Sequence, residues 1–204
     1  MKFIVIEGLD GSGKSTASKL LTERIANFGY PCYRTFEPTN GIIGTLIRSF
    51  LKGEEERPTN AAMALLFAAD RMEHIHNEIS PILMDNYVVC DRYYYSNMAY
   101  QSYDSEGLEL VLQYNKEAMK LCKPDITFFI DVTPDECMRR IEKRGEDKSI
   151  YENRLELELR YTQFMAAIER MKETDNIIKV GSNTMSPEDV VNQMWDYIKP
   201  GAAT

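Results

Sequence analysis

The pattern of apolar and polar positions is clearest at the start of the chain. The apolar run from Phe3 to Ile6 is unbroken, which is typical of a strand covered on both faces. A glycine-rich turn follows it, and apolar side chains then recur at helical spacing from Ala17 to Ala26. The pattern predicts a buried strand, a tight loop and a helix, in that order.

Short apolar runs and longer periodic stretches alternate along the rest of the chain. The short runs predict strands at residues 31–36, 87–90, 126–130 and 177–180. The longer stretches predict helices at residues 42–51, 60–83, 93–122 with a weak break at 104–107, 133–144, 151–173 and 186–198. Strands that alternate with helices are typical of a parallel sheet with helices on both faces. We therefore expect a three-layer, doubly wound α/β fold with a five-stranded parallel sheet.

Length and charge limit the kind of protein this is. The 204 residues are enough for one well-filled α/β core with a small lid, and too few for two ordinary domains. We expect a single domain over residues 1–204, with the lid at about 140–152. The formal net charge of -8 argues against a general nucleic-acid or membrane-surface binder, which needs a basic face. We therefore expect neither nucleic acid nor membrane as a partner.

The cysteines and the termini bear on the compartment. The four cysteines are far apart and form no C-x-x-C pair, which is typical of reduced thiols in a reducing compartment. The first strand begins almost at the N-terminus and leaves no room for a signal peptide, and no apolar run approaches membrane length. We expect a cytoplasmic protein.

The turn after the first strand has the spacing G-x-x-x-x-G-K-S-T, from Gly8 to Thr16. Glycines at such positions let backbone N–H groups approach a polyphosphate, while Lys14 reaches the outer phosphates and the Ser15 hydroxyl ligates magnesium. A chance glycine-rich turn is the alternative, but the strand before it and the helix after it favour the phosphate-binding loop. The sequence predicts a site for a nucleoside triphosphate with Mg²⁺.

Two further groups carry candidate chemistry. Asp91 and Arg92 follow a buried strand, where the aspartate could hold magnesium directly or through water and the arginine could bind a phosphate. A helix-capping aspartate is the alternative.

Phe67 and Arg71 share a helix face and suit a nucleotide acceptor, with the ring on a base and the guanidinium on its phosphate. A phenylalanine on an apolar stripe, however, is more often part of the core.

Two polar clusters complete the set. The first is a helix face that could read base edges or a sugar hydroxyl, or could simply face solvent, and it consists of Ser96, Asn97, Tyr100 and Gln101. The second is the one dense basic cluster of this acidic chain, Arg139, Arg140, Lys143, Arg144 and Lys148. It could form a lid that closes over phosphates, or could complement the dipole of a helix end.

Taken together, these stretches resemble the thymidylate kinase family of nucleoside monophosphate kinases. The resemblance rests on residues 7–16, 36–38, 66–71, 91–93, 96–97, 100–101, 123–125, 131–134, 144–145 and 151–152. The phosphate-binding loop is common to many families, but its combination with F-x-x-x-R, D-R-Y and S-N-x-x-Y-Q is specific. The resemblance implies phosphoryl transfer from ATP to dTMP, giving dTDP and ADP, by a homodimer that pairs through helices at 60–83 and 106–122.

The resemblance also implies a role for each matching residue. The ATP site would contain Gly8, Asp10, Gly11, Ser12, Gly13, Lys14, Ser15 and Thr16. The acceptor site would contain Glu37, Phe67, Arg71, Arg92, Ser96, Asn97, Tyr100, Gln101 and Tyr151, with Phe67 on thymine, Arg71 at the base and Glu37 near the sugar or the metal. Magnesium would be near Ser15, Asp91 and Glu152, and catalysis would involve Asp10, Lys14, Arg92, Arg140 and Arg144. Because the loop carries Gly11 and Ser12, the catalytic cations would come from the lid, and which of them contacts the transferred group is open.

Two other functions fit parts of the sequence. A deoxynucleoside kinase would phosphorylate a hydroxyl, which requires a carboxylate base, and Glu37 is the one candidate. A nucleotide-binding regulator without catalysis is the other alternative, and the intact Lys14, Ser15 and Asp91 argue against it.

Overall fold

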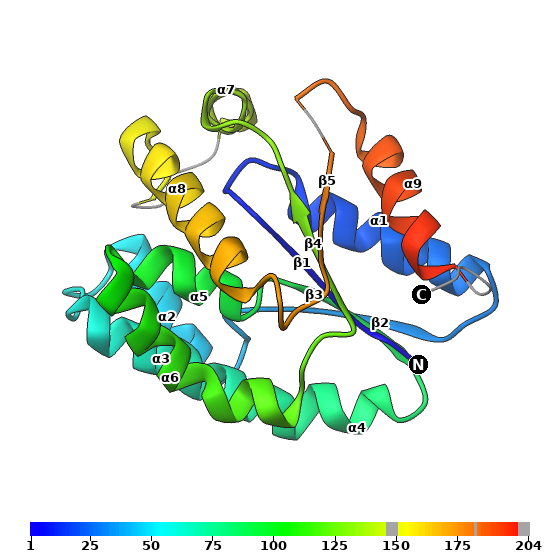
Figure 1. Cartoon of the computed structure of the whole chain (residues 1–204), viewed down its shortest axis with the longest axis horizontal. Coiled ribbons are helices and arrows are strands. Elements are labelled where there is room, and N and C mark those ends of the chain that lie inside the picture. The colour runs from blue at the N-terminus through cyan, green and yellow to red at the C-terminus, as the bar shows by residue number, and fades with distance from the viewer. Residues whose placement is uncertain (146–150, 182, 200–204) are drawn as a thin grey trace.

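The structure is a computed structural model, and it describes residues 1–145, 151–181 and 183–199. The strands of this described part form one parallel sheet in the order β2-β3-β1-β4-β5 (Figure 1). They are β1 (Phe3–Gly8), β2 (Cys32–Phe36), β3 (Tyr87–Asp91), β4 (Ile126–Ile130) and β5 (Ile177–Val180). The central strand β1 pairs with β3 on one side and β4 on the other. The predicted five-stranded parallel sheet is confirmed.

Helices cover both faces of this sheet (Figure 1). On one face, α1 (Lys14–Asn27) packs against α9 (Pro187–Ile198). On the other face lie α3 (Asn60–His74), α5 (Tyr94–Gln101), α6 (Ser105–Leu121) and α8 (Arg154–Met171). Two further helices sit beside these, with α2 (Ile42–Lys52) against α3 and α7 (Pro134–Arg144) against α8. The three-layer arrangement places the carboxyl ends of all five strands at one edge, where ligands of such folds bind.

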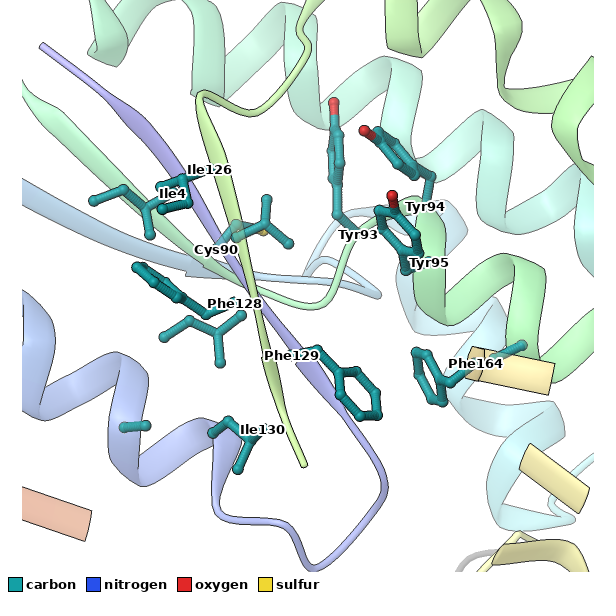
Figure 2. Packing of buried hydrophobic residues seen from close by; sticks show 14 of the residues in the cluster. Ile4, Cys90, Tyr93, Tyr94, Tyr95, Ile126, Phe128, Phe129, Ile130 and Phe164 are labelled. Atoms are coloured by element: carbon teal, nitrogen blue, oxygen red, sulfur yellow. The ribbon is translucent and has the colours of Figure 1, made fainter. Parts of the chain in front are cut away.

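The core explains why the strands are apolar on both faces. Every residue of β1 is buried. In β4, Phe129 points toward α8 and packs on Phe164 with ring centroids 5.2 Å apart, while Phe128 points the other way and meets Tyr197 of α9 (Figure 2). Burial of each such side chain stabilises the folded protein by about 1.5–3 kcal/mol, because its apolar surface leaves water. This burial on both faces fixes the sheet and, with it, the loops that follow its strands.

The long helices differ in detail from the prediction. The helix predicted at 60–83 is continuous, but a π-helical turn, η1 (Ile75–Ile79), separates α3 from α4 (Ser80–Leu83). Pro81 has no N–H to donate, and its ring would clash with the carbonyl four residues earlier, so the ladder widens just before it. The helix predicted at 93–122 is fully broken at 102–104, where the Asp104 side chain accepts the Gly107 N–H at 2.8 Å and caps α6.

Other predictions are resolved in part. The predicted lid falls partly on residues 146–150, including Lys148, which lie outside the described residues. No helix of the described part is long and apolar enough to cross a membrane. All four cysteines are free thiols, and three of them are buried.

Candidate functional site

The phosphate-binding loop joins β1 to α1 at the carboxyl edge of the sheet. Gly13 has φ 100° and Gly11 has φ 80°, both in the left-handed region that favours glycine. A Cβ on Gly11 would also lie 2.5 Å from the carbonyl oxygen of Cys137, because α7 packs directly on the loop. The loop backbone therefore requires glycine for its conformation and for its packing, as the motif predicts.

Lys14 begins α1 and is buried. Its Nζ donates to the carbonyl of Leu9 at 2.6 Å, within the loop itself. Burial lowers the pKa of Lys14 and Arg92 lowers it further, while Asp10 and Asp91 act in the opposite direction. The ammonium group thus lies at the loop with a single backbone acceptor, from which it can turn to an arriving phosphate.

Ser15 in the first turn of α1 lies beside Asp91, the last residue of β3. The Ser15 hydroxyl donates to Oδ2 of Asp91 at 2.6 Å. Oδ1 of Asp91 is buried and has no hydrogen-bond partner among the described residues. A buried carboxylate oxygen without a partner is costly unless a ligand satisfies it, and this pair offers the hard oxygen donors that Mg²⁺ prefers.

The donor set matches magnesium bound jointly by protein and nucleotide. No group of three or more His, Cys, Asp or Glu residues within the described ranges could form a metal cage. Mg²⁺ in kinases commonly uses one or two protein oxygens and completes its shell with water and phosphate oxygens. Glu152, also predicted near the metal, is bound instead by Arg144 at 2.8 Å. It lines a cavity whose wall includes neither Ser15 nor Asp91. Its role as a ligand stays a prediction.

Arg92 links the loop to α5. Its guanidinium donates to Oδ1 of Asp10 and, at 3.0 Å, to the hydroxyl of Ser96. The Tyr100 hydroxyl donates to the other Asp10 oxygen at 2.9 Å. Burial alone would raise the pKa of Asp10, but Arg92 and Lys14 outweigh it and the pKa is lowered. Asp10 is therefore an anion that holds two donors in place.

The backbone at Arg92 is unusual, since φ is 73° at a residue with a side chain. Glu7 accounts for this conformation. It is fully buried, and Oε1 accepts the N–H groups of Tyr93 at 2.7 Å and Ser96 at 3.0 Å. Burial raises the pKa of Glu7, and hydrogen bonds from Ser96 offset this only in part. Glu7 thus forces the turn from β3 into α5 that points Arg92 at the loop, a role that sequence reasoning did not assign to it.

A cavity of about 200 Å³ opens beside Asp10 and Arg92. Its lining includes Phe67, Ser96, Tyr100, Gln101 and Tyr151, all of which the sequence places in the acceptor site. Glu152, Pro38 and Leu51 complete the wall. We call this space the Asp10 cavity. It has an apolar ring on one side, amide and hydroxyl groups on another, and a guanidinium next to the phosphate-binding loop.

Three predicted acceptor residues lie behind this wall. Arg71 is only 1% exposed and donates to Glu37 at 2.6 Å and to the side chain of Asn115. Asn97 accepts from Asn115 at 2.8 Å and donates to Gln101 at 3.1 Å. Arg71 Nε is buried and has no hydrogen-bond partner in the described part of the chain. Glu37, Arg71 and Asn97 therefore form a support for the cavity, and their direct contact with an acceptor stays a prediction.

Two residues outside the motifs also shape the site. Arg57, from the segment between α2 and α3, donates to the Tyr151 hydroxyl at 2.6 Å and lies over its ring. His74 lies fully buried against Glu37. Neither belongs to a local motif, because each meets its partner only through the fold.

A second cavity, of about 430 Å³, lies on the other side of the loop. It is lined by Ser12, Gly13, Thr16, Ala17, Ile130, Val132, Glu136, Arg139, Arg140, Asn183, Met185, Pro187 and Val190. We call it the Arg140 cavity. Arg140 pairs with Glu136 at 2.7 Å and donates to the carbonyls of Ser12 and Asn183, both at 3.2 Å. These contacts favour a role for Arg140 in holding this cavity together, and its predicted catalytic role stays untested.

The two cavities flank a phosphate-binding loop, which is the arrangement expected of an enzyme that joins two nucleotides head to head. Comparison with known proteins gives the same result, since the thymidylate kinase family model matches residues 6–194. The chain belongs to the thymidylate kinase family. Asp10, Phe67, Arg92 and Tyr100, from four of the predicted motifs, thus converge in one cavity of this family member.

Several thymidylate kinases are similar to the chain along most of its length. A probable thymidylate kinase of Methanococcus aeolicus is 41% identical over 191 residues, which cover 93% of this chain and 91% of the relative. A probable thymidylate kinase of Methanocaldococcus jannaschii is 37% identical, with coverage of 97% and 95%. A thymidylate kinase of Leptospira interrogans is 38% identical, with coverage of 86% and 83%.

Proposed function

We propose that this chain transfers the γ-phosphoryl group of ATP to dTMP, giving dTDP and ADP. The observation that carries the proposal is the position of Arg92, which faces the Asp10 cavity while its partner Asp10 belongs to the phosphate-binding loop. An acceptor phosphate bound by Arg92 would lie next to the outer phosphate of a nucleotide held by the loop. Proximity of this kind supplies much of the rate enhancement in phosphoryl transfer.

The reaction needs charge neutralisation more than a general base, because the acceptor phosphate is already nucleophilic. Lys14 and the loop N–H groups serve the donor phosphates, and Arg92 serves the acceptor. Arg144 pairs with Glu152, which lines the Asp10 cavity, so this lid cation contacts the cavity wall. Ser15 and Asp91 would hold Mg²⁺, which neutralises phosphate charge when bound.

Acceptor recognition follows from the walls of the Asp10 cavity. Phe67 offers a face for a thymine ring, and Gln101 offers an amide that can donate and accept. Tyr100 is fixed by its bond to Asp10, which places its ring where it can crowd a ribose hydroxyl. The Arg140 cavity would take the base and sugar of ATP, since it adjoins the other end of the loop.

The alternatives have less support. A deoxynucleoside kinase would need Glu37 as a base, but one Glu37 oxygen binds Arg71 and the other faces His74. A regulator without catalysis would have no reason to keep both Arg92 and Lys14 close to Asp10. The test is ADP release with Mg-ATP across dTMP, dUMP, AMP, GMP, CMP and free thymidine. Preference for dTMP is expected, while turnover of thymidine alone would establish the nucleoside kinase.

The remaining proposals concern assembly and setting. We infer a single domain over residues 1–204 and a homodimer that pairs through the helices at 60–83 and 106–122, where Leu65 and Leu110 are each at least 40% exposed. Light scattering at micromolar concentration tests the dimer, and a monomeric mass would exclude it. We infer a cytoplasmic setting, because four free thiols suit a reducing compartment.

A further inference from the structure

Behind the Asp10 cavity, Glu37 lies between two nitrogen-bearing side chains. Its Oε2 accepts from Arg71 at 2.6 Å, and its Oε1 lies 3.1 Å from Nδ1 of His74. All three side chains are at most 2% exposed. His74 lines neither the Asp10 cavity nor the Arg140 cavity. Any effect that it has on the acceptor must therefore pass through Glu37.

The other ring nitrogen of His74 continues this chain of contacts toward the surface. Nε2 lies 2.7 Å from the hydroxyl oxygen of Thr35 in β2. The same hydroxyl lies 2.5 Å from Oε1 of Glu78 in η1. Four side chains thus form one row, Glu37, His74, Thr35 and Glu78, with three contacts of hydrogen-bond length between them. Nε2 of His74 also lies 3.5 Å from Oε1 of Glu78.

Each of these contacts requires one hydrogen between its two heavy atoms. A carboxylate supplies none, the threonine hydroxyl supplies one, and a neutral imidazole supplies one. With both carboxyls ionised and the ring neutral, three contacts would share two hydrogens. Two lone pairs would then face each other inside the protein, which is strongly unfavourable. The row must therefore hold one additional proton.

The surroundings decide where this proton resides. Oε2 of Glu37 already accepts from the guanidinium of Arg71 at 2.6 Å, so this carboxyl is paired with a cation. The Glu78 side chain is 35% exposed, so water can donate to its oxygens. On the imidazole, the proton gives two N–H donors directed at acceptors on either side. We propose that His74 is an imidazolium that positions Glu37, and through it Arg71.

The other groups around the ring are consistent with this charge. From β3, the thiol of Cys90 is neutral, since burial and the nearby Glu37 raise its pKa well above the ordinary value. A further cavity, of about 520 Å³, lies beside His74, and Asp70 and Glu73 of α3 also line it. Asp70 accepts from the backbone N–H and the hydroxyl of Thr39. Among the described residues that line this cavity with His74, Asp70, Glu73 and Glu78 are acidic and Arg34 is basic.

The consequence is a fixed orientation for Arg71. With a cation on each oxygen, Glu37 cannot rotate without breaking a charge-assisted bond. Arg71 in turn keeps its Nε, which is buried and has no hydrogen-bond partner in the described part of the chain, in a fixed direction. His74 is therefore a positioning residue for the acceptor. This functional consequence rests on the proposed function, whereas the protonation state does not.

The protonation state can be measured directly. The chain has only two histidines, and His76 is exposed and lies in the π-helical turn that follows His74, so it is an internal reference. A long-range ¹H–¹⁵N spectrum of protein labelled at histidine, recorded at neutral pH, reports both nitrogens of each ring, and His76→Gln assigns the signals. Two protonated nitrogens in His74 are expected. One protonated and one unprotonated nitrogen would overturn the proposal, whatever the enzyme phosphorylates.

Kinetics then test the positioning role. His74→Gln should raise KM for dTMP about 10-fold, as is common when the partner of a binding residue is lost, with KM for ATP changed by less than about twofold. His76→Gln, the matched control, should change neither. An unchanged KM for dTMP in folded His74→Gln would overturn the positioning role. If wild-type protein turned over no acceptor, the proposed function would fail and the spectrum alone would decide the state of His74.

Discussion

The Ser15 hydroxyl donates to Oδ2 of Asp91 at 2.6 Å and leaves Oδ1 buried without a partner among the described residues. The two residues are 76 positions apart and meet because β1 and β3 are neighbours in the sheet. Their arrangement explains how a short local motif becomes a metal site. The loop supplies one oxygen, and the adjacent strand supplies the charge.

Asp91→Asn should reduce kcat while leaving the fold intact. The amide can still accept from Ser15, but it lacks the negative charge that a divalent cation requires. We expect a loss in kcat of about 100-fold at ordinary magnesium levels, comparable to the loss of one strong electrostatic contact in an active site, with partial recovery as Mg²⁺ is raised. A magnesium titration of ADP release measures both effects.

The control for this variant is Asp131→Asn. Asp131 also follows a strand end, but it accepts from Tyr161 at 2.9 Å and lines neither the Asp10 cavity nor the Arg140 cavity. Its magnesium dependence should match that of the wild type. Identical magnesium curves for Asp91→Asn and wild type would remove Asp91 from the metal site.

Arg92→Lys should weaken use of the acceptor. Lysine has a single ammonium group and cannot reproduce the fork that reaches Asp10 and Ser96 together. Loss of one charged hydrogen bond costs about 1.5–3 kcal/mol, so kcat/KM for dTMP should fall about 10- to 100-fold, with KM for ATP little changed. Arg170→Lys, which alters an exposed pair with Glu109, should have no effect. A fully active Arg92→Lys would contradict the acceptor role.

The sequence was sufficient for the sheet and the loop because their signals are local. The apolar run Phe3 to Ile6, the glycines after it and the cap at Thr133 each act within a few residues. The same holds for Phe67 and Arg71, whose shared helix face follows from their spacing. The sequence could not show that Arg71 lies behind the cavity wall, because its burial depends on Asn115 in another helix.

Long-range partners account for what was missed. Glu37 and His74 are 37 positions apart, and Arg57 and Tyr151 are 94 apart. No periodicity relates such pairs, so the sequence singles out neither His74 nor Arg57 as part of the site. The apolar pattern does not predict the π-helical turn at 75–79 for a different reason. This turn changes the hydrogen-bond ladder of the helix without changing which positions are apolar.

Arg140→Ala distinguishes catalysis from ATP binding. The guanidinium joins α7 to the loop carbonyl of Ser12 and to Asn183, so its loss should loosen the Arg140 cavity. We expect KM for ATP to rise about 10-fold and kcat to fall by less than about threefold. Initial rates over a matrix of ATP and dTMP concentrations measure both. A large fall in kcat with unchanged KM for ATP would instead restore Arg140 to catalysis.

Phe164→Ala should affect stability and activity together. Phe164 is fully buried and packs on Phe129 at 5.2 Å and on Tyr100 at 6.0 Å, between ring centroids. The free energy of unfolding should fall by about 3–5 kcal/mol, which urea denaturation measures. Because Tyr100 loses its support, its hydroxyl should hold Asp10 less firmly, and KM for dTMP should rise. Phe164→Leu fills most of the space and should lose clearly less stability. A normal KM in a strongly destabilised Phe164→Ala would show that Arg92 alone fixes Asp10.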